Sequence, residues 1–223
     1  MSSIEKNIAG IRERMKKAAE KAGRDPSGIR LIAVTKTATL DQIKEAVQCG
    51  MRDLGENRLQ AAEPKMLSLS EHKDIRWHMI GHLQTNKVKK AVELFWLIHG
   101  VDSLRLAKEI DKEAAKKGPV FPVLLEVNIG EEDSKFGVRP QDVKELLSQC
   151  STLQSIKVQG LMAMAPFSRD PEASRHCFKK MSLLKKELGL EYLSMGMSGD
   201  FETAIEEGSD MVRIGTAIFD RNE

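Results

Sequence analysis

Lys36 is the residue of this sequence best placed for covalent chemistry. It directly follows the apolar run Leu31-Ile32-Ala33-Val34-Thr35, which is typical of a buried β-strand. In a barrel of parallel strands, the carboxyl ends of the strands form the active-site face. A lysine amine that is partly removed from water there can attack a carbonyl group and form a Schiff base. Taken alone, a lysine in this position is more often an ordinary surface residue.

Two pairs of small residues near the end of the sequence have the features of a phosphate site. Ser198-Gly199 and Gly215-Thr216 each combine a hydroxyl group with a glycine, which lets the backbone approach a ligand closely. Each pair alone is typical of a plain turn. Together they follow the seventh and eighth expected strands, where barrels often bind phosphate. We expect Asp200 to cap the next helix, with its carboxylate directed at the helix amides and away from phosphate.

Arg213 helps to identify the class of ligand. It lies two residues before Gly215, so both residues can face the same side of a strand. A reactive lysine opposite a phosphate site suits pyridoxal 5′-phosphate, or a phosphorylated sugar in a Schiff-base aldolase. Because an arginine keeps its proton, Arg213 at a pyridine nitrogen would leave that nitrogen unprotonated and weaken the ring as an electron sink. The alternative for Arg213 is a structural ion pair.

Short apolar runs alternate with helical patterns along the sequence. Residues 3–23 have helical spacing, Thr39 begins a capping-box pattern, and Pro140 is typical of a first helical position. Strands that alternate with helices indicate a parallel sheet. Eight strands favour an α/β fold of the (β/α)8 TIM-type barrel class with an extra N-terminal helix, over an open doubly wound sheet. The expected strands are Leu31–Thr35, Met51–Leu54, Arg76–Ile80, Phe95–Ile98, Val120–Asn128, Ile156–Met162, Tyr192–Met197 and Met211–Gly215.

The composition narrows the classes of partner. No shift in composition marks a domain boundary, so we expect residues 1–223 to form a single domain. Lysine and arginine number 35 and aspartate and glutamate 33, and this balance favours neither nucleic acid nor an acidic membrane. Three distant cysteines, without an apolar leader or a membrane-spanning run, indicate a cytoplasmic protein. Lysine pairs such as Lys185-Lys186 are expected to be solvated helix surface, with an RNA or regulatory partner as the alternative.

His78 and His82 are four residues apart, a spacing that can form a metal pair on a helix. Here they fall at the end of an expected strand and in the loop after it. No third ligand accompanies them, so we expect no metal site. Either histidine could instead line a cofactor pocket.

Six motifs, taken in order, resemble one known family. The motifs are Ala33-Val34-Thr35-Lys36-Thr37, Gly55-Glu56-Asn57-Arg58-Leu59-Gln60, Trp77-His78-Met79-Ile80-Gly81-His82-Leu83-Gln84-Thr85-Asn86-Lys87, Gly160-Leu161-Met162-Ala163-Met164-Ala165, Met197-Ser198-Gly199-Asp200 and Val212-Arg213-Ile214-Gly215-Thr216-Ala217-Ile218-Phe219. The resemblance covers nearly the whole sequence. On these motifs the sequence is identified as a member of the pyridoxal phosphate homeostasis protein family, whose barrel is similar to the N-terminal domain of bacterial alanine racemase.

The resemblance assigns roles to individual residues. It implies that Lys36 carries pyridoxal 5′-phosphate as a Schiff base, that Arg213 faces the pyridine nitrogen, and that Asn57 contacts the cofactor. Lys135 falls where the family keeps a second lysine linked to cofactor exchange. The residues implied to hold the phosphate are Ser198, Gly199, Gly215 and Thr216.

Two departures from the family pattern lie at the end of the sequence. Asp220 follows Phe219, where members usually have glycine. The sequence stops at Arg221-Asn222-Glu223, whereas many members continue into a basic or aromatic tail. The resemblance therefore does not assign to this sequence any role of that tail in cofactor handling.

The resemblance implies a protein of vitamin B6 homeostasis rather than a robust enzyme. Alanine racemase needs a second base, a tyrosine from a separate domain of the partner subunit, and this sequence ends soon after the eighth strand. Its only tyrosine, Tyr192, begins the seventh strand, away from the barrel mouth. Without that base, proton exchange loses a factor of about 10²–10⁴. We expect a monomer that buffers the cofactor or delivers it to apo-enzymes, with a weak amino-acid racemase or lyase as the alternative.

Overall fold

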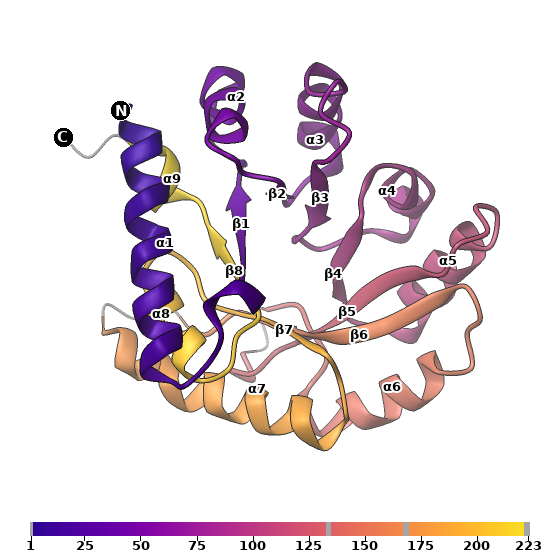
Figure 1. Cartoon of the computed structure of the whole chain (residues 1–223). Helices are drawn as coiled ribbons and strands as arrows, with labels where there is room; N and C mark the ends of the chain where they lie inside the picture. Colours follow the sequence, from indigo (N-terminus) through magenta and orange to yellow (C-terminus); the bar gives the residue numbers. More distant parts are fainter. Residues whose placement is uncertain (1, 133–134, 167–169, 221–223) are drawn as a thin grey trace.

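Eight parallel strands form a closed barrel in a computed structural model that describes residues 2–132, 135–166 and 170–220 (Figure 1). The strands are neighbours in sequence order, and the first closes the barrel by pairing with the last. The predicted barrel is therefore confirmed, and an open doubly wound sheet is excluded. The strands are β1 (Arg30–Val34), β2 (Asp53–Glu56), β3 (Arg76–Met79), β4 (Leu97–Val101), β5 (Phe121–Val127), β6 (Ile156–Ala163), β7 (Tyr192–Ser194) and β8 (Met211–Ile214).

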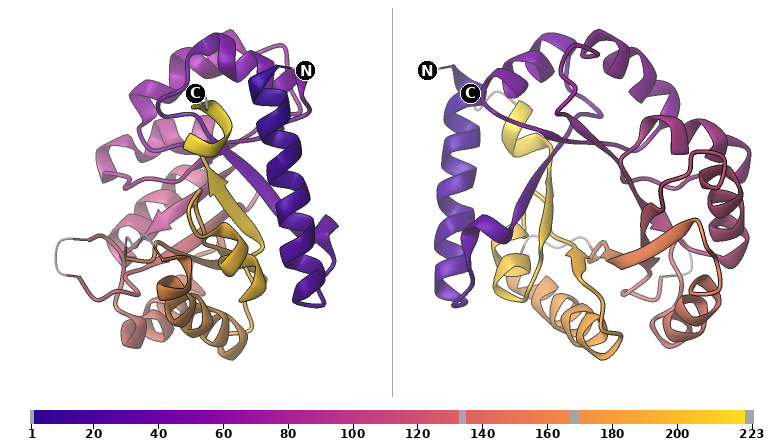
Figure 2. Two further views of the ribbon diagram at one scale, coloured as in Figure 1. Left: turned by 90° about the vertical axis from the view of Figure 1, so that its left-hand side faces the viewer. Right: turned by 45° about the vertical axis from the view of Figure 1, so that its right-hand side comes forward.

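Helices connect these strands and surround the barrel (Figure 2). The helix before β1 buries one apolar stripe, which includes Ile4, Ile8 and Ile11, and it packs against the last two helices. This is the extra N-terminal helix that the sequence predicts. Within the described ranges the α-helices are α1 (Ser3–Lys21), α2 (Leu40–Gln48), α3 (Leu59–Ser68), α4 (Val88–Leu94), α5 (Leu104–Ala114), α6 (Val143–Cys150), α7 (Arg175–Glu187), α8 (Phe201–Glu206) and α9 (Thr216–Phe219).

The helix starts follow the capping signals in the sequence. Thr39 Oγ1 accepts the N–H of Gln42, and the Gln42 side chain accepts the N–H of Thr39, so the predicted capping box before α2 is formed. Ser103 caps α5 by accepting the N–H of Leu106. Pro140 opens a short 3-10 turn that leads into α6. These signals mark where the chain enters α2, α5 and α6.

Three strands, β2, β4 and β7, differ from the prediction by more than one residue at one or both ends. β4 begins at Leu97 rather than Phe95, because the N–H of Phe95 still bonds to the carbonyl of Ala91 at the end of α4. β7 ends at Ser194, since Gly196 has φ +91° and turns the chain out of the sheet. β2 begins and ends two residues later than predicted and finishes on a buried glutamate.

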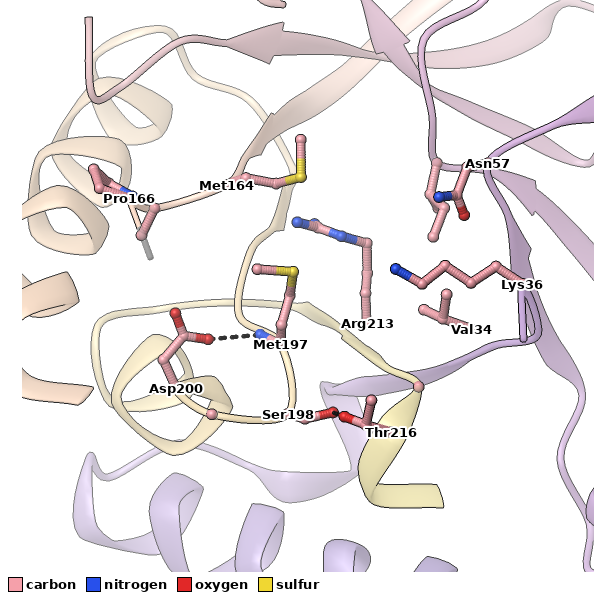
Figure 3. Close-up of a pocket in the computed structure, with 14 residues that line it drawn as sticks. Val34, Lys36, Asn57, Met164, Pro166, Met197, Ser198, Asp200, Arg213 and Thr216 are labelled. Atoms are coloured by element: carbon pink, nitrogen blue, oxygen red, sulfur yellow. Dashed lines mark hydrogen bonds between the residues drawn. The ribbon is translucent and has the colours of Figure 1, made fainter. Parts of the chain in front are cut away.

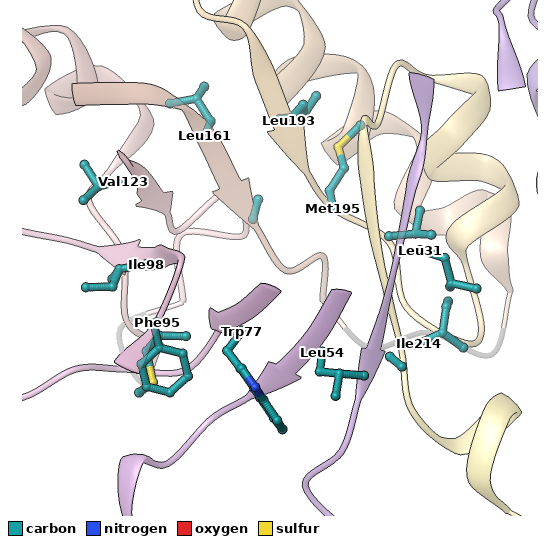
Figure 4. Packing of buried hydrophobic residues seen from close by; sticks show 14 of the residues in the cluster. Leu31, Leu54, Trp77, Phe95, Ile98, Val123, Leu161, Leu193, Met195 and Ile214 are labelled. Carbon is teal, nitrogen blue, oxygen red and sulfur yellow. The ribbon is translucent and has the colours of Figure 1, made fainter. Parts of the chain in front are cut away.

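Residues along each strand alternate between two environments. One set faces the helices and forms the main apolar core, which includes Leu54 and Ile214 (Figure 4). A second, much smaller apolar cluster fills the barrel interior and consists of Ile32, Leu97, Leu124, Met162 and Met211. The barrel interior also contains buried polar side chains, namely Asp53, His78, His99, Glu126, Ser194 and Arg213.

Candidate functional site

A cavity of ≈ 340 Å³ opens at the carboxyl ends of the strands (Figure 3). All seven predicted site residues line it, although they come from segments as far apart in sequence as β1 and β8. Parallel closure of the barrel explains this convergence, because it brings every strand's carboxyl end to one rim. The cavity is lined by Val34, Lys36, Asn57, Ile80, Met164, Ala165, Pro166, Met197, Ser198, Gly199, Asp200, Arg213, Gly215 and Thr216.

Lys36 lies in the turn just after β1, and its side chain extends into the cavity toward Arg213 (Figure 3). The residue is exposed, so the partial burial that the sequence suggested is not seen. The backbone before it is held firmly. Thr35 Oγ1 donates to Glu56 Oε1 at 2.6 Å, and Lys65 Nζ donates to the Thr35 carbonyl at 2.6 Å and to Glu56 Oε1 at 2.5 Å. A fixed backbone therefore presents a solvent-accessible amine that makes no hydrogen bond or ion pair with the described residues.

The two small-residue pairs meet at one wall of the cavity, beside β1. Thr216 Oγ1 donates to Ser198 Oγ at 2.9 Å, and the N–H of Ala217 also donates to Ser198 Oγ, at 3.3 Å. A Cβ added at Gly199 would meet no atom within 4 Å, so this glycine keeps space open in the cavity wall. At Gly215 a Cβ would approach the Val34 carbonyl at 3.3 Å. This wall combines hydroxyl groups, amides and free space, which are the features that a phosphate group requires.

The prediction for Asp200 is wrong in part. Asp200 occupies the N-cap position of α8, but its side chain makes no capping bond to the helix amides. Its Oδ1 instead accepts the N–H of Met197 at 2.7 Å, so the carboxylate closes the turn that precedes the helix (Figure 3). Asp200 thus lines the cavity, and its negative charge acts on Arg213.

Arg213 lies at the floor of the cavity and is 4 % exposed. Its Nη1 donates to Ser194 Oγ at 2.7 Å, and its Nη2 donates to the Ala163 carbonyl at 2.9 Å. Burial lowers the pKa of Arg213 to about 10, against the opposing effects of Glu126 and Asp200. The guanidinium therefore stays charged at neutral pH, and its orientation is fixed by two acceptors.

A chain of buried hydrogen bonds continues from Arg213 through the barrel interior. Ser194 Oγ lies 3.0 Å from His99 Nδ1, and His99 Nε2 lies 3.0 Å from His78 Nδ1. His78 Nε2 lies 2.9 Å from Asp53 Oδ1. The chain ends at Asp53, whose carboxylate also accepts two hydrogen bonds from Arg76, at 2.8 Å and 2.6 Å. We name these five residues, Asp53, His78, His99, Ser194 and Arg213, the polar chain.

The protonation states determine the direction of the polar chain. Burial lowers the pKa of His78 and holds that of His99 well below its usual range, so both rings are neutral. Burial alone would raise the pKa of Asp53, but hydrogen bonds from His78 and Arg76 outweigh it and the pKa is lowered. An ionised Asp53 can only accept, so His78 donates to it from Nε2. Every hydrogen in the polar chain is then donated away from Arg213 and toward Asp53.

Sequence reasoning missed most of the polar chain. Its five residues lie in five different strands, so no short sequence motif contains them. The available signal was polar residues at inward positions of otherwise apolar strands, such as Ser194 between Leu193 and Met195.

The suggestion that His78 or His82 lines the cavity is wrong for both residues. His78 is fully buried within the polar chain. His82 Nδ1 lies 3.3 Å from Asp102 Oδ2, and its ring stacks on Phe136 with centroids 3.9 Å apart. In the described part of the chain, no group of three or more possible metal ligands is found.

Four further residues that the sequence analysis singled out have defined positions. Asn57 lines the cavity, and its buried Oδ1 has no hydrogen-bond partner among the described residues. Lys135 lies outside the cavity lining and pairs with Glu132 at 2.5 Å; its motif neighbours at 133 and 134 are outside the described residues. Tyr192 is at the amino end of β7, with its ring 5.2 Å from the Arg30 guanidinium, at the opposite end from Lys36. Asp220 ends the described chain after α9, and the tail at 221–223 lies outside it.

Glu126 on β5 is the one buried carboxyl group near Arg213 for which the described residues provide no hydrogen-bond partner to Oε2. Burial and the charge of Asp102 raise the pKa of Glu126 to about 7, against the effect of Arg213. The folded state then binds more protons than the unfolded state between about pH 4.5 and 7, so ionisation of Glu126 destabilises the fold as pH rises through that window.

We expect Glu126→Gln to remove this dependence. The unfolding free energy of the variant relative to wild type should rise by up to about 3 kcal/mol between pH 4.5 and 7.5, measured by urea denaturation. Because only the change of this free-energy difference with pH is used, any effect of the amide that does not depend on pH cancels. The exposed Glu187→Gln is the matched control and should show a flat difference; equal pH profiles for the two variants would refute the assignment.

Comparison with known proteins agrees with this geometry. The model of the alanine racemase N-terminal domain matches residues 5–222. Fold and cavity thus define an alanine racemase-type barrel with a lysine after β1 and two hydroxyl groups after β7 and β8. The chain belongs to the pyridoxal phosphate homeostasis protein family: such a protein from Aquifex aeolicus is 44% identical over 218 residues, which is 95% of each chain, and one from Escherichia coli is 38% identical over 226 residues. The resemblance drawn from the sequence motifs is confirmed.

Solved structures extend the comparison. PipY of Synechococcus elongatus, solved without and with bound pyridoxal phosphate, gives a TM-score of 0.85 in both cases. Its identity to this chain is 35% and 34%, and the match covers 97% of this chain and 99% of PipY. An alanine racemase from Clostridium difficile gives a TM-score of 0.68 at 17% identity, with 98% of this chain and 56% of the racemase covered, and it shows a shared fold alone.

Proposed function

We propose that this protein binds pyridoxal 5′-phosphate in the cavity at the barrel mouth and serves in the homeostasis of that cofactor. The observation that carries the proposal is the convergence of Lys36, the Ser198–Thr216 hydroxyl pair and Arg213 on one cavity. The family of the chain and the bound state of PipY support it.

The residues present fit the chemical groups of the cofactor. The Lys36 amine would form a Schiff base with the aldehyde, with loss of one water. The hydroxyls of Ser198 and Thr216 and the backbone at Gly199 and Gly215 would hold the phosphate. The orphan Asn57 Oδ1 would accept a hydrogen bond from a ligand hydroxyl, which would remove the cost of a buried unpaired acceptor.

Arg213 determines what chemistry this site can support. Bound pyridoxal phosphate supplies an electron sink whose strength depends on protonation of the ring nitrogen. A guanidinium with a pKa of about 10 would donate a hydrogen bond to that nitrogen and would not release its proton at neutral pH. The site would therefore bind and orient the cofactor while weakening it as a catalyst.

We propose that the protein holds and releases the cofactor and has no robust reaction of its own. The single tyrosine of the sequence, Tyr192, lies at the opposite end of the barrel from Lys36 and cannot act as a second base there. Lys36 is exposed, so another protein can reach the attached cofactor. A weak racemase or lyase activity remains the enzyme alternative, because the exposed Lys36 amine is also reachable by an amino acid.

Finer features of the proposal concern partners and location. We propose a single domain over residues 1–223 that is cytoplasmic, acts as a monomer and delivers the cofactor to pyridoxal phosphate-dependent apo-enzymes, without nucleic acid or a membrane as partner. The near balance of 35 basic and 33 acidic residues supports the absence of nucleic acid. None of the described helices has the length and hydropathy needed to span a membrane.

The test is a visible absorbance titration of the purified protein with pyridoxal phosphate, followed by borohydride reduction and peptide mapping. We expect a saturable band and one reduced adduct on the peptide that contains Lys36. Amino-acid racemase and lyase assays on the same sample should give no turnover at a useful rate; efficient turnover would select the enzyme alternative. A protein without a band or an adduct would refute cofactor binding and favour a phosphosugar enzyme.

A further inference from the structure

A second cavity lies at the opposite end of the barrel from Lys36. Its volume is ≈ 450 Å³, and α1 and the amino ends of β1, β2 and β3 form its walls. This volume is within the range of small-molecule sites. Five cationic side chains line this lower cavity, and they are Arg12, Lys16, Arg30, Arg52 and Arg76. Asp53 is the one lining carboxylate, whereas the whole chain is nearly balanced in charge at +2.

Asp53 does not provide a counter-charge for the other cations of the lower cavity, because its carboxylate already pairs with Arg76 and His78. It accepts two hydrogen bonds from Arg76 and one from His78. Arg52 pairs with Asp74, outside the lining of the lower cavity.

Arg12 and Arg30 have no carboxylate within 4.0 Å in the described ranges of the chain. Nη2 of Arg12 makes only long contacts, 3.4 Å to the Gly50 carbonyl and 3.9 Å to the Met51 sulfur. Two guanidinium charges without counter-charges in one concave site produce a positive potential that attracts anions.

The guanidinium of Arg30 is held in place by rings instead of by a carboxylate. It lies 5.2 Å from the Trp96 ring centroid and 5.2 Å from that of Tyr192. Its Nη1 is shielded from solvent and has no hydrogen-bond partner among the described residues. The rings and a side-chain hydrogen bond with Tyr192 hold the guanidinium without a carboxylate, and the fork of an arginine matches the oxygens of a phosphate group.

We infer that the lower cavity is a second anion site, which takes a small molecule that carries a phosphate group, either inorganic phosphate or a phosphate monoester. Arg12 and Arg30 provide its unpaired charges, and Lys16 adds a third cation that is only loosely paired, 3.8 Å from Glu20. The inference goes beyond cofactor binding at Lys36 and does not depend on it.

The test is a titration monitored by amide proton–nitrogen NMR, which distinguishes binding at one end of the barrel from binding at the other. Inorganic phosphate or glycerol 3-phosphate is added at constant ionic strength, with sodium chloride as the reference salt. We expect saturable shifts at Arg30, Gly50 and Met51. Tighter binding of glycerol 3-phosphate would identify a monoester site, and equal or tighter binding of inorganic phosphate a phosphate site; both support the inference. Shifts at Ser198 and Gly199 report separately on binding in the cavity that Lys36 lines.

Arg12→Gln and Lys17→Gln are a matched pair, because each removes one exposed positive charge from α1 and only Arg12 lines the lower cavity. We expect R12Q to raise the half-saturating phosphate concentration at Gly50 and Met51 at least tenfold, and K17Q to leave it within about twofold. No shifts beyond those of sodium chloride, or equal binding by the two variants, would overturn the inference and leave the arginines with a purely stabilising role.

Discussion

Lys36→Ala should abolish covalent attachment of pyridoxal phosphate while leaving the fold intact. The side chain is exposed and, among the described residues, it makes no hydrogen bond or ion pair, so its removal should change the unfolding free energy by no more than about 0.5 kcal/mol. The variant should lack the visible band of the wild type and give no adduct after borohydride reduction, as measured by absorbance and intact-protein mass.

Two control variants make the Lys36 experiment specific. Lys44→Ala removes an exposed lysine from α2, away from the cavity, and should keep the band and the adduct. Lys135→Ala examines the second lysine of the family pattern, which pairs with Glu132 outside the cavity lining. A K36A protein that still forms the adduct at the wild-type level would disprove the assignment of Lys36.

Asp53→Asn should lower stability and also disturb the distant cofactor site. The amide removes the charge that anchors the polar chain, and its NH₂ group cannot accept a hydrogen bond from Arg76 or His78. Losing the charge of Asp53, which is 10% exposed and bonds to the fully buried His78, should cost about 3 kcal/mol of unfolding free energy, measured by urea denaturation. Because the polar chain orients Arg213, we also expect several-fold weaker binding of pyridoxal phosphate.

Asp74→Asn is the matched control for Asp53→Asn. Asp74 also pairs with an arginine at the amino end of the barrel, but its side chain is 60% exposed, so the loss should stay below about 1 kcal/mol. If Asp53→Asn lowers stability yet leaves the affinity and the visible spectrum of the bound cofactor unchanged, the polar chain supports only the fold.

The sequence predicted those parts of the site that local patterns encode. Lys36 follows an apolar run, and Ser198 and Thr216 sit beside glycines after strands, so their convergence required only that the barrel close in sequence order. The Asp200 prediction failed because a short acceptor can serve either the helix after it or the turn before it, and the choice depends on backbone geometry.

The polar chain was beyond prediction for a different reason. Its contacts join residues 19 to 95 positions apart, as between His99 and Ser194 or between Ser194 and Arg213. A histidine at an inward strand position gives no local sign of its partner, and its tautomer depends on both neighbours at once. The sequence indicated that Arg213 faces the barrel mouth, whereas its supporting acceptors became visible only in three dimensions.

The polar chain has a consequence for how the protein folds. It takes Asp53, His78 and His99 from the first half of the barrel and Ser194 and Arg213 from the second half. A fragment that contained only β1–β4 would bury His99 Nδ1 without a donor, and a β5–β8 fragment would bury the Ser194 hydroxyl without the acceptor of its hydrogen. Each half would thus contain a buried polar group that only the other half satisfies, at about 1–3 kcal/mol per group. We expect the two half-barrels to be unable to fold separately and the whole barrel to assemble in one cooperative step.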